Sequence, residues 1–266
     1  MTTSTPSNPS TWWRTLCWVT DQLIVTGDLD ARREIAVRQL DEWAAVGVTH
    51  IVDVRQEWND ISLVAEHQPH MTYLHRPTHD NGGTQDDEWF ASGVAAIVDA
   101  ITSHSDNTVV VHCHMGVNRA PSLAFAALLT MGWPATEALS QIRRARPIAA
   151  VLYAEQAANW FAQHHGMPTS DRLELRADVR QWLADNPVDV RWVVSRIRQA
   201  ENNPSTSPAS VNARAMSPQL LRSLPTRVVN QEVLLCGSLP SQASSAQSCT
   251  ETNQTSSLSG PGIVHR

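Results

Sequence analysis

The sequence contains no lysine, because all 20 of its basic residues are arginine. A Walker-type phosphate loop, a protein kinase and a Schiff-base enzyme each need a lysine amine, so these three chemistries are excluded. The basic residues form no dense cluster, and the net charge of −6 gives a pI near 6.0. Since binding to a phosphate backbone depends on clustered positive charge, we expect no nucleic acid partner.

Cysteines and long apolar runs are also scarce. The chain has four cysteines in 266 residues, and their spacing forms no pairs. This usage is typical of a reducing compartment, so we expect free thiols and a cytoplasmic protein. The sequence has neither an apolar run of about 18 residues nor the basic start and apolar stretch of a signal peptide. We therefore expect no membrane association.

Polar segments at both ends predict disorder. Residues 1–11 are mostly polar, and in residues 203–266 Ser, Thr, Pro, Gln and Asn make up 33 of 64 positions. Such segments have too little apolar surface to form a core. Within the second segment only 227–237 is apolar enough for a short strand or a docking segment. The ordered part is expected at 12–202.

Short β-branched runs predict four strands in the first part of this range. We expect them at 23–26, 49–54, 71–75 and 107–112. The last is the most continuous apolar run, as expected for a central strand that is covered on both faces. Because helical stretches alternate with these strands, the fold class is α/β, with a central, mainly parallel sheet of about four to five strands flanked by helices.

Apolar residues at helical spacing predict the helices between and after these strands. The predicted helices cover residues 36–44, 85–103, 121–131, 135–146 and 151–164. We expect Asp28 or Asp30 to cap the first helix and Gly47 to end it. Thr84 and Asp87 have the spacing of a capping box that starts the second helix.

A further pair of helices is predicted near 172–184 and 188–200, within a helical extension at 167–202. Asn186 is expected as the N-cap of the second helix, with Pro187 at its first position. Apolar residues that include Leu173 and Trp192 predict a stripe on each helix that packs against the rest of the protein.

A cysteine lies between the central strand and the helix that follows it. Backbone N–H groups converge at such a position and the helix dipole is positive there, so a thiolate or a phosphate is stabilised near Cys113. Arg119, six residues later, can curl back and bind two phosphate oxygens through its planar guanidinium. Gly116 lets the loop turn tightly and lets its N–H groups approach a ligand.

Two other interpretations of this loop are weaker. Cys113 could be an inert buried cysteine beside an unrelated arginine, but the preceding valines, Gly116 and the following helix all fit one phosphate-binding arrangement. A zinc site at His112, Cys113 and His114 is disfavoured, because three adjacent residues at a strand end cannot converge on one tetrahedral ion.

The loop resembles that of the dual-specificity branch of the cysteine-dependent protein tyrosine phosphatases, which reads His-Cys, five residues, Arg. The similarity runs from about Trp18 to Phe161 and includes Ile142-Arg-Arg-Ala-Arg-Pro147. It implies a catalytic domain at 12–166 that needs no metal or cofactor. It also implies a phosphate-binding loop that contains His112, His114, Met115, Gly116, Val117 and Asn118.

The resemblance further implies the catalytic roles. Cys113 matches the nucleophile that forms a phosphocysteine, and Arg119 matches the residue that binds the phosphoryl oxygens. Asp80, in a polar loop before two glycines, matches the general acid that protonates the leaving group. Its competitors are the carboxylates that begin the next helix, which are Asp86, Asp87 and Glu88. His75 and His79 could share the work, although neither has a named partner.

Two positions depart from the usual pattern of the family. Ala120 stands where many members have a Ser or Thr that stabilises the leaving thiolate, so we expect slow hydrolysis of the phosphoenzyme. Asn118 stands where protein phosphatases frequently have Ser and where related RNA 5′-triphosphatases have Asn. The second departure is the main argument for a substrate other than a protein.

We therefore expect a phosphatase whose partner is a phosphorylated protein, acting on phosphotyrosine and also on phosphoserine or phosphothreonine. The alternative activities are an RNA 5′-triphosphatase and a phosphoinositide or glucan phosphatase. A lipid enzyme of the family would carry more basic residues in the loop, where only His114 could serve. From a different functional class, a phosphopeptide-binding pseudophosphatase would normally lack the cysteine or the arginine, and both are present.

Overall fold

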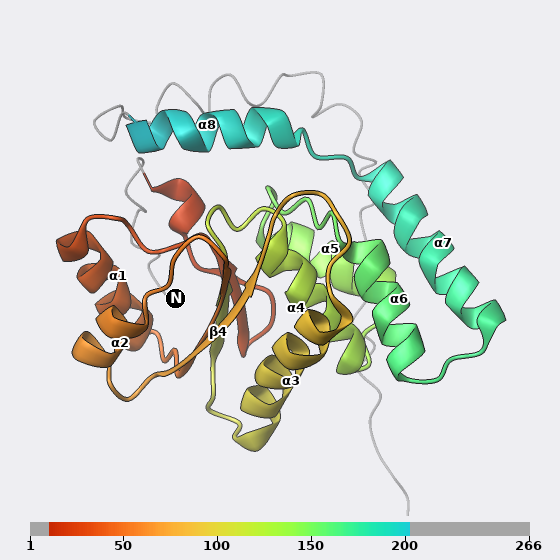
Figure 1. Ribbon diagram of the computed structural model, residues 1–266, viewed down its shortest axis with the longest axis horizontal. Helices are drawn as coiled ribbons and strands as arrows, with labels where there is room; N and C mark the ends of the chain where they lie inside the picture. The colour runs from red at the N-terminus through yellow and green to blue at the C-terminus, as the bar shows by residue number, and fades with distance from the viewer. Residues whose placement is uncertain (1–10, 203–266) are drawn as a thin grey trace, which may run out of the picture. The chain divides into compact units, whose positions relative to one another are not determined.

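A five-stranded sheet lies at the centre of residues 11–202, which are the residues that the computed structural model describes (Figure 1). The predictions for residues 1–10 and 203–266, including the segment 227–237, lie outside this range. The strand order is β1-β2-β5-β3-β4, in which only the β1–β2 pair is antiparallel. The strands are β1 (Cys17–Trp18), β2 (Leu23–Thr26), β3 (His50–Arg55), β4 (Thr72–Thr78) and β5 (Val109–His112). The predicted α/β class with a mainly parallel sheet is confirmed.

Helices cover both faces of this sheet (Figure 1). The first face packs on α1 (Arg33–Ala45) and α2 (Ile61–His67). The second face packs on α3 (Asp87–Ser103), α4 (Arg119–Thr130), α5 (Ala135–Ala145) and α6 (Ala154–His164). Side chains alternate along β5, so that Val110 contacts the first layer while Val109 and Val111 contact the second. Burial on both faces explains why β5 is so continuously apolar.

Helix starts were predicted less well than the helices themselves. The N-cap of α1 is Arg32, and Asp30 instead accepts a hydrogen bond from the Arg32 N–H. The predicted capping box of α3 is also wrong, because Asp86 is the N-cap and accepts from the Glu88 N–H at 3.0 Å. The prediction missed β1, α2 and a short 3₁₀ helix at Trp12–Arg14.

Two further helices, α7 (Thr169–Asp185) and α8 (Val190–Asn202), pack against the rest of the described chain. Val179 of α7 belongs to the same core cluster as α4, α5 and α6, so α7 shares the core of the preceding residues. The predicted stripe is only partly correct, because Leu173 is 62% and Trp192 38% exposed. The predicted cap of α8 is wrong: the helix begins at Val190, and Asp189 accepts from the Trp192 N–H.

None of the helices in residues 11–202 is long and apolar enough to cross a membrane.

Candidate active site

The loop that joins β5 to α4 carries Cys113 and leads directly into Arg119, the first residue of α4. Both side chains are buried, Cys113 at 2% and Arg119 at 3% exposure. Gly116 adopts a φ of +61°, and a Cβ atom on it would lie 2.5 Å from the backbone oxygen of Thr26. Only glycine therefore fits at this point of the loop. The structure thus places the predicted nucleophile at the amino end of a helix.

The guanidinium of buried Arg146 links this loop to Trp13. Its guanidinium donates to the backbone oxygens of Gly116 at 2.6 Å, Met115 at 3.0 Å and Trp13 at 2.6 Å. Three bonds from one planar group fix the curvature of the loop. Arg146 lies in the motif Ile142-Arg-Arg-Ala-Arg-Pro147, from which its role was not predicted.

The guanidinium of Arg119 is hydrogen-bonded along one edge and has no hydrogen bond in the described structure along another. Nη1 and Nη2 each donate to a carboxylate oxygen of Glu57 at 2.9 Å, and Nη1 also donates to the Thr78 backbone oxygen at 3.0 Å. Nε has no hydrogen-bond partner among the described residues, although it lies 3.5 Å from Asp80 Oδ2. Of the five N–H groups, Nε–H and one hydrogen of Nη2 are left. These two form a fork that suits two oxygens of a phosphate.

Glu57 is a site residue that the sequence analysis missed. It follows the carboxyl end of β3, at the same sheet edge as the loop after β5, and that position was the available signal. Burial is the largest single influence on Glu57 and opposes its ionisation. The hydrogen bond from Arg119, a backbone hydrogen bond and the charges of Arg119 and His114 together outweigh burial and lower the pKa of Glu57. Glu57 is thus a carboxylate that aligns the guanidinium.

Asp80 is joined to the same loop. Its Oδ1 accepts from Asn118 Nδ2 at 2.7 Å and from the Tyr153 hydroxyl at 3.0 Å. The competing carboxylates Asp86, Asp87 and Glu88 instead lie at the start of α3, where Asp86 is the N-cap. The structure therefore brings Asp80, rather than these three, to Arg119 and Asn118.

Neither of the two histidines that could share the acid role is bonded to the loop in the described structure. His75 bonds through Nε2 to the backbone oxygen of Arg55 at 2.7 Å. His79 contributes its backbone oxygen, which accepts from Gln85 at 3.2 Å. The contact of His75 gives its imidazole a structural role, whereas the contact of His79 involves only its backbone.

A strained turn between α5 and α6 supports Asn118 and Asp80. Val151 has a φ of 53°, which a β-branched residue adopts only at a cost in free energy. The turn directs the Leu152 N–H to Asn118 Oδ1 at 2.7 Å and the Tyr153 hydroxyl to Asp80. Burial and the neighbouring Asp80 carboxylate raise the pKa of Tyr153, so the hydroxyl remains a donor. Asn118 thereby connects the Cys113 loop to the loop of the candidate acid.

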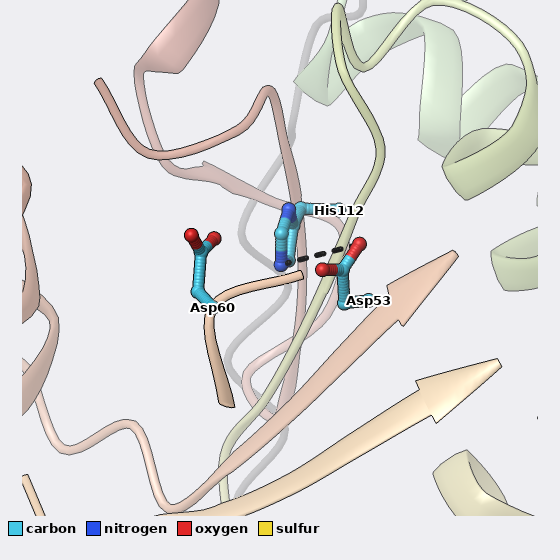
Figure 2. A group of neighbouring side chains, drawn as sticks. All are labelled: Asp53, Asp60 and His112. Carbon is cyan, nitrogen blue, oxygen red and sulfur yellow. Dashed lines mark ion pairs between the residues drawn. The ribbon is translucent and has the colours of Figure 1, made fainter. Parts of the chain in front are cut away.

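His112 belongs to a buried polar cluster behind the loop. Asp53, Asp60 and His112 converge closely enough to hold a metal ion (Figure 2). However, the buried Arg55 guanidinium bonds to Asp53 Oδ2 at 2.6 Å and also to Asp60. A cation at this position would be repelled by that guanidinium, so the cluster fits an internal ion network better than a metal site. Burial lowers the pKa of His112 to about 4, and the imidazole is therefore neutral.

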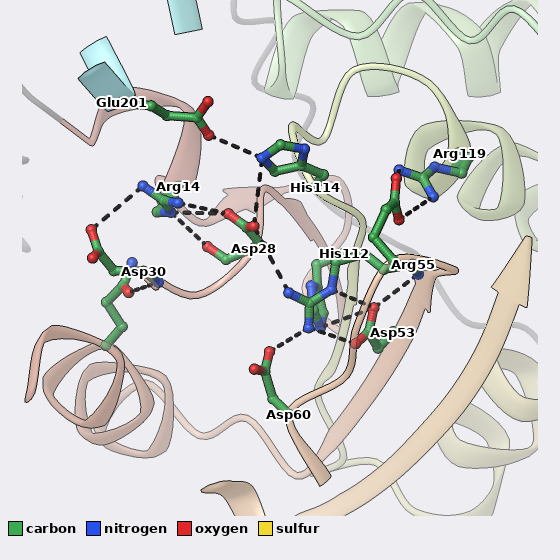
Figure 3. Close-up of polar contacts among 12 residues, drawn as sticks. Arg14, Asp28, Asp30, Asp53, Arg55, Asp60, His112, His114, Arg119 and Glu201 are labelled. Carbon is green, nitrogen blue, oxygen red and sulfur yellow. Dashed lines mark hydrogen bonds and ion pairs between the residues drawn. The ribbon is translucent and has the colours of Figure 1, made fainter. Parts of the chain in front are cut away.

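The remaining loop residues face other elements. His114 is turned toward Asp28 and Glu201 and away from Arg119 (Figure 3). Val117 is buried in a small cluster with Ala150, against which Met115 packs. The side chains of His114, Met115 and Val117 thus anchor the loop, and its backbone, Cys113 and Arg119 are the candidate ligand-binding groups.

Comparison with known proteins relates part of the chain to a phosphatase family. Residues 34–157 match the model of the dual specificity phosphatase catalytic domain, a range that contains Asp80, Cys113 and Arg119. These residues are therefore similar to a dual specificity phosphatase catalytic domain. No curated protein sequence matches the chain. Helices α7 and α8 lie beyond the matched residues.

Solved structures of this phosphatase class are similar in fold to the chain. Human DUSP28 is 20% identical, with a TM-score of 0.46, and the match covers 57% of this chain and 97% of that chain. The human tyrosine phosphatase-like serine/threonine/tyrosine-interacting protein is 18% identical, with a TM-score of 0.45 and coverage of 57% and 99%.

Proposed function

We propose that this protein is a cysteine-dependent phosphatase that hydrolyses phosphotyrosine in proteins, with phosphoserine and phosphothreonine as further substrates. The observation that carries the proposal is the buried Nε–Nη2 edge of Arg119, which has no hydrogen-bond partner in the described structure and lies at the end of the Cys113 loop. The small number of cysteines, whose spacing in the sequence forms no pairs, supports a place of action in the cytoplasm.

The proposed reaction has two steps. In the first, the Cys113 thiolate attacks phosphorus, an S–P bond forms, and the P–O bond to the leaving oxygen breaks as Asp80 gives that oxygen a proton. In the second, Asp80 takes a proton from water, the water oxygen bonds to phosphorus, and the S–P bond breaks to release phosphate. Arg119 and the loop N–H groups stabilise the phosphoryl oxygens in both steps.

Two exposed apolar side chains support an aromatic phosphate ester as substrate. Trp58, which follows Glu57, is 44% exposed, and Leu152, whose N–H bonds to Asn118, is 54% exposed. Both belong to segments that contact the site. A tyrosine ring gains more from such surfaces than a sugar or an inositol does.

The argument for an RNA 5′-triphosphate substrate is weakened by the contacts of Asn118. Its side chain accepts from the Leu152 N–H and donates to Asp80, which gives the residue a role in any reaction that needs the acid. The net charge of −6 also disfavours an RNA substrate.

The test is hydrolysis of three substrates in EDTA: a phosphotyrosine peptide, a phosphoserine peptide and an RNA 5′-triphosphate. We expect the wild type to act on the phosphotyrosine peptide fastest and the Cys113→Ser variant to have no activity on any of them. Fastest release from RNA would favour the triphosphatase. A wild type as inactive as Cys113→Ser, but able to bind the phosphopeptide, would overturn the proposal in favour of a binding module.

A further inference from the structure

Helix α8 packs against the phosphate-binding loop, although it follows the family-matched residues by more than thirty positions. Val193 and Ile197, on one face of α8, are buried at 4% and 0% exposure. They form a cluster with Val117 of the loop and with Ala150. The C-terminal helix therefore contributes to the surroundings of the candidate active site.

The last turn of α8 adds a polar contact to the same loop. Glu201 Oε1 lies 3.0 Å from Nε2 of His114, the residue that follows Cys113 (Figure 3). The two side chains are 26% and 27% exposed, and both line a cavity of about 310 Å³. Solvent thus reaches both side chains of this pair.

Acidic groups surround His114 from three directions. Glu201 approaches from α8, Asp28 from the end of β2 at 3.9 Å, and Glu57 from the end of β3. Asp28 is itself paired with Arg14 at 3.0 Å, and the ring of Trp58 packs edge-on against His114. The hydrogen bond to Glu201 raises the pKa of His114 and is the largest influence on it.

Residues outside α8 form hydrogen bonds to the backbone of the loop, whereas α8 contacts the side chains of His114 and Val117. The Asp28 N–H donates to the His114 oxygen at 2.9 Å, and the Ala150 N–H donates to the Val117 oxygen at 2.7 Å. Arg146 donates to the backbone oxygens of Met115 and Gly116, which lie between His114 and Val117. Glu201 makes the shortest of the polar contacts that the His114 side chain has in the described structure.

We infer that Glu201 is a positioning residue for the phosphate-binding loop, which it acts on by holding the His114 side chain as an imidazolium. This inference rests on the proposed phosphatase function. His114 follows Cys113 in the chain, and its ring is held by Glu201 rather than by the nucleophile. A positive charge on this loop residue favours, over a longer range, both the thiolate and a bound phosphate dianion. Helix α8 then contributes to the activity of the phosphatase as well as to its fold.

The test combines a proton titration with kinetics on the full chain. Glu201→Gln keeps the shape and a hydrogen-bond acceptor but removes the charge. Glu174→Gln, at an exposed position of α7 without a polar partner in the described structure, is the matched control. NMR titration of the His114 ring should show a lower pKa in Glu201→Gln and the wild-type pKa in Glu174→Gln.

In the kinetic experiment, the loss of kcat/KM in Glu201→Gln should depend on pH. Near pH 7.5 we expect kcat/KM of Glu201→Gln to fall about two- to fivefold, chiefly through KM, which is the range of a partly exposed ion pair. Near pH 5.5 the loss should shrink, because the imidazole is then protonated in both proteins. In a His114→Gln background, Glu201→Gln should have no further effect. A loss of the same size at both pH values, or an unchanged His114 pKa, would overturn the inference.

The two proposals fail separately. If the wild type hydrolyses no phosphate ester, the proposed function fails, but the His114 titration still reports whether Glu201 controls its charge. If the wild type is active and Glu201→Gln has wild-type kinetics at every pH, only the inference about α8 fails.

Discussion

Glu57 and Arg119 form a two-point contact in which each carboxylate oxygen accepts from a different terminal nitrogen at 2.9 Å. Glu57 comes from the end of β3 and Arg119 from the start of α4, so the pair ties two loops at the carboxyl edge of the sheet. The contact uses the outer edge of the guanidinium and leaves the Nε edge for a ligand. Glu57 thus helps to orient a guanidinium that the Thr78 backbone oxygen also holds.

Replacing Glu57 by Gln should therefore weaken catalysis without unfolding the protein. We expect kcat/KM to fall about 10- to 100-fold, from the loss of roughly 1.5–3 kcal/mol of charge-assisted hydrogen bonding. Steady-state kinetics on an aryl phosphate measures this. Glu66→Gln, which removes an exposed partner of Arg33, is the control and should behave as wild type. Equal activity of the two variants would show that Arg119 needs no alignment.

Asn118 should affect the leaving-group step, because its amide donates to Asp80. We expect Asn118→Ser to lose about tenfold in kcat with a phosphoserine peptide and far less with para-nitrophenyl phosphate, whose leaving group needs no proton. Asp80→Asn should show the same pattern with a larger loss. If Asn118→Ser slows both substrates equally, Asn118 acts on phosphate binding instead.

Local patterns predicted the parts of the site that are continuous in sequence. The apolar run of β5, Cys113, Gly116 and Arg119 lie within eleven residues, so strand, turn and helix signals all bear on the same short segment. Asp80 was chosen through the family resemblance, and the structure places it against Asn118.

Contacts that depend on tertiary packing were not predicted. The approach of Glu57 to Arg119 requires β3 to pair with β5, and the approach of Glu201 to His114 spans 87 positions of the chain. The predicted N-cap of α1 was wrong for a related reason. Asp30 is a residue type that commonly caps helices, but its carboxylate accepts hydrogen bonds from both the backbone N–H and the side chain of Arg32. Leu173 is exposed although it fits the apolar spacing, because periodicity does not say how far a partner surface extends.

Gly116 and Gly132 both have a positive φ, but an added Cβ atom would meet a steric conflict only at Gly116. At Gly116 a Cβ would collide with Arg146 and Thr26, whereas at Gly132, with a φ of +87°, it would meet nothing within 4 Å. We expect Gly132→Ala to cost about 1 kcal/mol of unfolding free energy and Gly116→Ala roughly 2–5 kcal/mol, with loss of activity. Urea denaturation of both variants tests this. Similar costs would mean that the loop relaxes around the added methyl group.

The buried His112 should make stability depend on pH on the acidic side. Burial lowers its pKa to about 4 in the folded protein, against 6.5 in the unfolded chain. As the pH falls from about 6.5 to about 4, the unfolded state therefore binds a proton that the folded state does not. The unfolding free energy should decrease by up to about 1.4 kcal/mol per pH unit.

His112→Gln removes this titration and should flatten the decrease, measured by urea denaturation at several pH values. His104→Gln is the control, because the His104 side chain is 65% exposed. If the two variants show the same dependence on pH, His112 is not the titrating group.

The most direct measurement is mass spectrometry of the wild type, quenched in acid during turnover of para-nitrophenyl phosphate. The account predicts one phosphoryl group on the peptide that contains Cys113 and none in Cys113→Ser. Because Ala120 lacks the hydroxyl that assists the second step in many relatives, the phosphoenzyme should accumulate in the wild type and decline in Ala120→Ser. Turnover with no phosphate on Cys113 in the wild type or in Ala120→Ser, or with phosphate on another residue, would contradict the account.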